Sequence, residues 1–86
     1  MGVWTNLEVS ESTVTTTKTV TLARKCRAIE IINDSGSQSL KFKFKSGESY
    51  STLKPLESWS ADYRARTILL NSPSTKSVAY RIRALG

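Results

Sequence analysis

The side chains that perform most enzyme chemistry are scarce in this chain of 86 residues. It has no histidine and a single cysteine, Cys26. The commonest general base, the usual zinc sites and a disulfide within the chain are therefore excluded. Glu57 and Asp62 lie five residues apart around an expected turn, which is weak support for the carboxylate pair of a glycosidase. We expect no catalytic residue, no metal and no cofactor, and we interpret Cys26 as a small buried apolar side chain.

The basic side chains indicate binding rather than catalysis. Thirteen Lys and Arg against seven Asp and Glu give a net charge of +6. This charge favours an acidic partner, such as nucleic acid, a polyanionic envelope or an acidic protein surface, although solubility alone also accounts for it. We predict a basic surface made of cations that point outward from two strands: Lys41, Lys43, Lys45, Arg81 and Arg83.

The pattern around the three lysines argues against a nucleic-acid site. Because side chains alternate along a strand, Phe42 and Phe44 fall on the face opposite the lysines, where we expect the core. Oligonucleotide-binding barrels place exposed aromatic rings among their cations so that bases can stack on them. Nucleic acid is therefore a secondary expectation, with weak and sequence-independent binding.

The most regular stretch of the sequence runs from residue 28 to residue 45 and predicts a β-hairpin. Two alternating apolar segments flank a polar loop at residues 33–39. Both apolar faces meet one core when the numbers of paired residues sum to an odd value, as they do when Ile31 lies opposite Phe42. The same register pairs Asn33 with Leu40, Ile29 with Phe44, and, on the outer face, Glu30 with Lys43.

The rest of the chain consists of short strand-like segments separated by turn signals. We expect strands at residues 13–22, 49–53, 58–63, 66–70 and 78–84. Such spacing favours an all-β fold, a small antiparallel β-sandwich or barrel. We expect this single domain to span residues 13–86, after a less regular N-terminal arm or edge strand at residues 1–12. No stretch is apolar enough for a membrane span and no signal peptide opens the chain, so we expect synthesis in a cytoplasm and no membrane partner.

Several segments between Ile29 and Leu85 match a family pattern. A strand closes at Asn33-Asp34, and SLKFKF, TLKPLESWSADYRA and VAYRIRALG follow at residues 39–44, 52–65 and 78–86. Together they resemble the small β-sandwich structural proteins encoded by tailed bacteriophages. The second segment is similar to the L-x-P-G-E-S-aromatic turn of that family, with Leu56 where glycine is expected. The resemblance implies a virion component: a capsid decoration protein, a head–tail fitting or a tail module.

Our leading hypothesis is a non-enzymatic structural protein of a phage particle, made in the host cytoplasm and located in the virion. It acts through protein–protein contacts in multiple copies, with itself as a homo-oligomer and with other virion proteins. The candidate interface residues are Trp4 on the arm and two apolar side chains that point outward if their neighbours are buried, Ile32 and Leu69. The alternative is a basic nucleic-acid-binding β-barrel, and a third reading is a sugar- or envelope-binding module of a tail.

Overall fold

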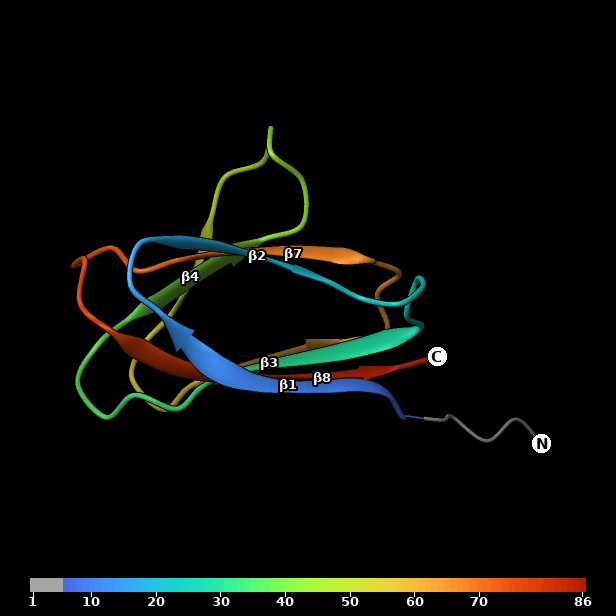
Figure 1. The fold of residues 1–86 in the computed structure, drawn as a ribbon, viewed down its shortest axis with the longest axis horizontal. Helices are drawn as coiled ribbons and strands as arrows, with labels where there is room; N and C mark the ends of the chain where they lie inside the picture. The colour runs from blue at the N-terminus through green and yellow to red at the C-terminus, as the bar shows by residue number, and fades with distance from the viewer. Residues whose placement is uncertain (1–5) are drawn as a thin grey trace.

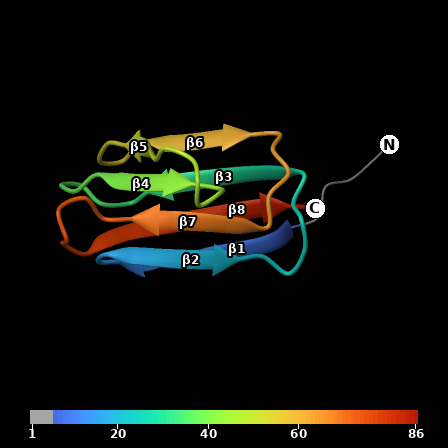
Figure 2. The ribbon, with the colours of Figure 1, turned by 90° about the horizontal axis from the view of Figure 1, so that it is seen from above.

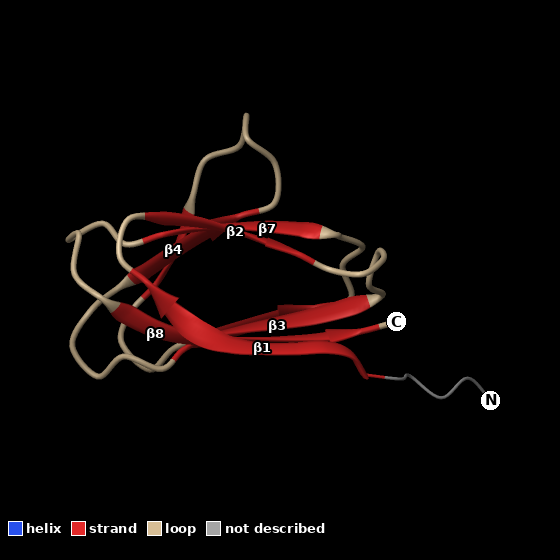
Figure 3. Cartoon of the chain, viewed as in Figure 1, coloured by secondary structure: helices blue, strands red, loops and turns tan. Residues whose placement is uncertain are grey.

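The chain folds as a sandwich of two antiparallel β-sheets, as seen in a computed structural model (Figures 1 and 3). The structure describes the backbone of residues 6–86 and the side chains from Ser12 onward. Its strands are β1 (Asn6–Val14), β2 (Thr17–Thr21), β3 (Ala28–Asn33), β4 (Leu40–Lys43), β5 (Ser51–Leu53), β6 (Ser58–Ala61), β7 (Thr67–Asn71) and β8 (Val78–Leu85). Residues 6–86 contain no helix, so the predicted all-β sandwich is confirmed.

Each sheet has four strands. The β1 sheet has the order β1-β8-β3-β6, and the β2 sheet has the order β2-β7-β4-β5 (Figure 2). The chain passes from one sheet to the other at almost every connection. Among the described strands, β4 and β5 are the only sequence neighbours that pair with each other. The edge strands β1 and β2 lie along one side of the sandwich, and β5 and β6 lie along the other (Figure 2).

The predicted hairpin over residues 28–45 is wrong in its strand pairing, but the inward faces predicted for its two strands are correct. β3 pairs with β6 and β8, whereas β4 pairs with β5 and β7 in the other sheet. Ile31 and Phe42 are both buried, with 0% and 3% of their surface exposed, but they enter the core from opposite sheets. An alternating pattern identifies the buried face of a strand and does not specify which strand lies beside it. The predicted pairing of Glu30 with Lys43 is therefore also wrong.

The strand predicted over residues 13–22 is divided between the two sheets. β1 ends at Val14 and β2 begins at Thr17, with the turn at residues 15–16. Val14, Val20 and Leu22 are buried, as their spacing predicted. β1 already begins at Asn6 and pairs with β8 along its length, so residues 6–12 form part of an edge strand. Trp4 lies outside the described residues.

The core consists of the side chains on the inward faces of both sheets. β8 alternates as predicted: Val78, Tyr80, Ile82 and Ala84 are buried, with Arg81 and Arg83 exposed between them. At the edge of the sandwich, Lys18 of β2 donates to Ser12 Oγ of β1 at 3.1 Å, and its ammonium lies 5.6 Å from the centre of the Tyr80 ring. The long lysine thereby covers the edge of the core between the two sheets.

Candidate functional site

The predicted basic surface is divided between the two outer faces of the sandwich. Arg81 and Arg83 lie on the β1 sheet, and Lys41 and Lys43 lie on the β2 sheet. Lys45 follows the end of β4 and is exposed. The five cations therefore do not form one continuous surface.

Both arginines of the predicted surface are in ion pairs. Arg81 Nε donates to Asp34 Oδ2 at 2.7 Å and its Nη2 to Oδ1 at 3.1 Å, a bidentate pair. Arg83 Nη1 lies 3.6 Å from Glu30 Oε1, so Glu30 has an arginine where the sequence predicted a lysine. Paired guanidinium groups attract a polyanion less than free ones do, which weakens the case for a ligand on this face.

One of the two lysines on the other face, Lys43, is also engaged within the protein. Lys43 Nζ donates to the Ser46 carbonyl at 3.1 Å and lies 4.2 Å from the centre of the Tyr50 ring.

Ile32 and Leu69 are partly buried, and they lie on the outer faces of different sheets. In the ladder, Ile32 stands beside Arg81, whereas Leu69 stands beside Thr19 and Lys43. These two candidate interface residues cannot form a single apolar patch.

Four aromatic side chains gather at the side of the sandwich that carries β5 and β6. Phe42 is buried, and Phe44, Trp59 and Tyr63 are partly buried and pack against the core. The ring centres of Phe44 and Tyr63 are 4.5 Å apart, and those of Phe44 and Trp59 are 5.5 Å apart. We call Phe44, Trp59 and Tyr63 the aromatic cluster. The sequence placed Phe44 in the core with Phe42; Phe44 follows the end of β4, packs against the core and is only partly buried.

Two hollows of about 420 Å³ each open beside the aromatic cluster, and they share Phe44 and Tyr63 as walls. One extends over Trp59 and Phe42 toward the loop of residues 44–50. The other is lined by four cations, Lys25, Lys45, Arg64 and Arg66. Ala65 and Thr67 complete this wall. We call the two hollows together the aromatic–basic groove. This groove combines partly exposed rings with several cations.

Hydrogen bonds between loops fix the shape of this groove. The N–H groups of Leu22 and Cys26 donate to the carbonyls of Arg66 and Ala65 at 2.7 and 2.9 Å. Cys26 Sγ donates to the Tyr63 carbonyl at 3.2 Å, so the cysteine is buried and structural as predicted. Figure 2 shows the two loops side by side at one end of the sandwich.

The third loop of the groove is held by a carboxylate. Glu48 Oε1 accepts the N–H groups of Phe44 and Lys45 at 3.2 and 3.1 Å. This loop projects above the β2 sheet in Figure 1. The sequence contained two signals for the groove, the basic corner at residues 24–27 and the run Tyr63-Arg64-Ala65-Arg66, but nothing local showed that they meet.

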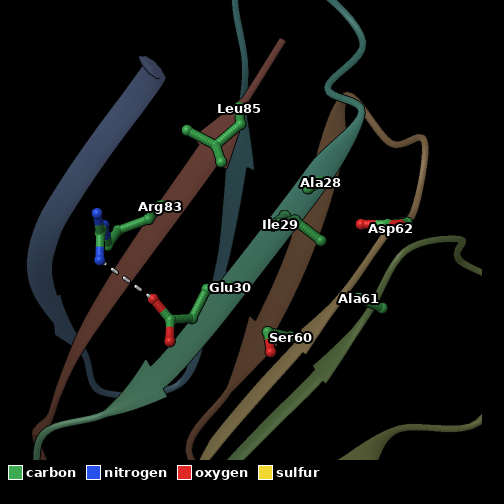
Figure 4. A pocket seen from close by; sticks show the side chains of 8 residues that line it. All are labelled: Ala28, Ile29, Glu30, Ser60, Ala61, Asp62, Arg83 and Leu85. Atoms are coloured by element: carbon green, nitrogen blue, oxygen red, sulfur yellow. Dashed lines mark ion pairs between the residues drawn. The ribbon is translucent and has the colours of Figure 1, made fainter. Parts of the chain in front are cut away.

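A larger hollow of about 550 Å³ lies on the β1 sheet (Figure 4). Its walls are Ala28, Ile29, Glu30, Ser60, Ala61, Asp62, Arg83 and Leu85. The Glu30 carboxylate is paired with Arg83, and no described histidine or lysine lines the hollow to activate Ser60. Ser60 makes no side-chain hydrogen bond to Glu30 or to Asp62, the other carboxylate of the lining.

The possible carboxylate pair of Glu57 and Asp62 is separated by β6. Five extended residues separate the two Cα atoms by about 16 Å, and an odd number of steps along a strand turns the two side chains to opposite faces. Glu57 instead accepts the Lys54 N–H at 2.6 Å and stabilises the turn before β6. The two carboxylates do not make a catalytic pair.

Within the described part of the chain, no group of three or more His, Cys, Asp and Glu side chains is placed to hold a metal ion. None of the described segments forms a helix long and apolar enough to cross a membrane. No protein-family model matches the sequence, and no curated protein is significantly similar to it.

Proposed function

We propose that this protein is a non-enzymatic structural component of a phage particle that acts through protein–protein contacts in multiple copies. The family resemblance of residues 29–85 suggests the setting, as a capsid decoration, head–tail or tail component. One structural observation supports contacts between copies. It is the position of the longest strand, β1, at the edge of its sheet.

The free side of β1 is suited to pairing with another strand. β1 has nine residues and pairs on one side with β8. On its other side, no strand from residues 6–86 is paired with it. An edge of this kind presents a row of N–H and C=O groups that can bind a strand of a second chain.

The sequence of β1 has none of the lysine and proline that usually protect an edge strand. Soluble proteins blunt such edges with charged side chains, above all lysine, with proline or with a bulge, and NLEVSESTV contains no lysine and no proline, only the two acids Glu8 and Glu11. The register of β1 shifts only at its beginning, between Asn6 and Glu8. The neighbouring edge strand β2 is shorter and carries Lys18, so it is the better protected of the two. We infer that copies associate through β1.

Sedimentation velocity over a hundredfold range of concentration tests this assembly. We expect reversible self-association of the full chain and its loss when Val9 and Thr13 are both changed to lysine, because cations on an edge oppose strand addition. The matched control changes Thr17 and Thr21 of β2 to lysine and should associate like the unchanged protein. A chain that stays monomeric throughout, or two variants that behave alike, would contradict association through β1.

The virion assignment needs a separate measurement. Quantitative mass spectrometry of gradient-purified phage particles should find the chain at a fixed ratio of many copies per particle. Absence from particles that contain their capsid, portal and tail proteins would overturn the assignment. The genes beside the coding sequence give an inexpensive first check, since flanking capsid, portal or tail genes support the proposal.

A further inference from the structure

The net positive charge of the protein is concentrated around the aromatic–basic groove. Three loops, residues 22–27, 44–50 and 62–66, surround it and carry six cations against two acids. Four of the six net charges of the chain are therefore at this site. The cations that line the groove itself are Lys25, Lys45, Arg64 and Arg66.

These four cations are available to a ligand. Among the described side chains, the ion pairs are those of Arg81 and Arg83, and both lie on the β1 sheet. Arg66 donates one hydrogen bond, from Nε to the Leu22 carbonyl at 3.1 Å, which leaves its terminal nitrogens as further donors. The two nearby acids are Glu48, which is bonded to backbone N–H groups of its own loop, and Asp62, and neither forms an ion pair with these cations.

The aromatic cluster adds ring faces to this charge. Phe44 and Tyr63 form part of the wall of both hollows and are partly exposed. The sequence discounted nucleic acid because it placed Phe44 in the core, away from any cation. The structure instead places Phe44 and Tyr63 in the same hollow as the four cations.

We propose that the aromatic–basic groove binds single-stranded nucleic acid, a role beyond the protein contacts proposed above. Phosphates pair with the cations of the three loops, and a base stacks against Tyr63 and Phe44. A duplex fits this site poorly, because its bases are stacked inside the helix and cannot reach rings set in a hollow. An acidic protein segment would satisfy the cations but would leave the ring faces without a stacking partner.

The test measures fluorescence anisotropy of a labelled oligothymidylate with the full-length protein. We expect a dissociation constant of roughly 10⁻⁵ M at physiological salt, as for other sequence-independent binding. Neutralising about four phosphates should give a slope of about −3 when log affinity is plotted against log salt. An abasic chain of the same length and charge should bind about tenfold more weakly, since it has no base to stack.

Two sets of variants locate the site. Replacing Lys25 and Arg64 by alanine should halve the salt slope, because two phosphate contacts are lost. The matched control replaces Lys54 and Lys76, two exposed lysines outside the groove, and should change the slope much less. Tyr63→Leu should weaken oligothymidylate binding about tenfold and leave binding of the abasic chain unchanged. Unchanged thermal denaturation of each variant is required before its binding is compared.

Three outcomes would overturn the proposal. One is equal binding of the oligothymidylate and the abasic chain, which would leave charge as the only attraction. Another is tighter binding of polyglutamate or of duplex DNA than of the single strand. The third is a control variant that loses as much salt dependence as the groove variant. None of these results bears on sedimentation or on the presence of the chain in particles, so the two proposals can fail independently.

Discussion

At the scale of single residues, Asn33 makes more side-chain hydrogen bonds than any other buried polar residue in the described part of the chain. Its side chain is 0% exposed at the end of β3. Its Nδ2 lies 2.8 to 3.1 Å from the carbonyl oxygens of Gln38, Leu53 and Lys54. Its Oδ1 accepts the N–H of Ser35 at 2.9 Å. One side chain thus joins the end of β3, the loop before β4 and the end of β5, and so ties the two sheets together.

Replacing Asn33 by alanine should destabilise the domain by roughly 2–4 kcal/mol, because several buried backbone groups would lose their partner. The matched control is Asn71→Ala. Asn71 donates a single exposed bond, to the Thr16 carbonyl at 3.1 Å, and its loss should cost less than about 1 kcal/mol. Urea denaturation of both variants measures the difference. Equal losses would show that Asn33 does not hold the loops together.

The two faces of β4 provide a second comparison of residues. Phe42 is 3% exposed, and its ring centre lies 5.3 Å from that of Trp59, so Phe42→Ala should cost roughly 3–5 kcal/mol. Lys43 points outward and contacts Ser46 and Tyr50, so Lys43→Ala should cost less than about 1 kcal/mol. Chemical denaturation gives both values, and similar stabilities of the two variants would mean that the faces of β4 are assigned wrongly.

At the scale of elements, the turn before β6 has an unusual residue at its critical position. The Glu57 N–H donates to the Lys54 carbonyl at 3.0 Å, which closes a four-residue turn with Pro55 second and Leu56 third. Leu56 has a φ of 66°, as the third residue of a type II turn requires. Glycine usually occupies such a position. Leu56 thus stands where the L-x-P-G-E-S-aromatic turn has glycine. It adopts the backbone conformation that favours glycine, and its side chain is 70% exposed.

Leu56→Gly should stabilise the isolated domain by roughly 0.5–1 kcal/mol. A leucine in the left-handed conformation costs more free energy than the entropy that glycine adds to the unfolded chain, so the substitution gives a net gain in stability. The control is Thr52→Gly in β5, where no strain is relieved and glycine should cost roughly 0.5–1 kcal/mol. Thermal and urea denaturation of the two variants should give shifts of opposite sign. A loss of stability in Leu56→Gly would mean that the leucine makes contacts that outweigh its strain.

At the scale of the whole molecule, we expect self-association through β1 at one side of the sandwich and nucleic-acid binding at the aromatic–basic groove. Removing residues 1–8 tests the self-association. The deletion shortens β1 and removes Trp4, but it keeps the strand pairs from Val9↔Arg83 to Val14↔Val78. We expect the shortened chain to keep its β circular dichroism and to lose roughly 1–2 kcal/mol, in line with a few backbone hydrogen bonds. Its self-association in sedimentation should be weaker. Loss of the β signal would show that the first residues are needed for folding.

The sequence by itself determined the fold class and the buried faces of the strands. Alternation in β3, β4 and β8 correctly marked Ile31, Phe42 and Tyr80 as buried, because the direction of a side chain along a strand depends only on local geometry. It also indicated that Cys26 is a buried side chain, and the structure confirms this.

Only the tertiary structure decided which strands are neighbours. Ile31 stands between Ile82 and Trp59 in its sheet, whereas the sequence placed it beside Phe42. Pairing depends on contacts between segments far apart in the chain, and many strands with the same pattern compete for each position. The aromatic–basic groove was hidden for the same reason. Its cations, Lys25, Lys45 and Arg64, come from three loops that meet only when the two sheets pack together.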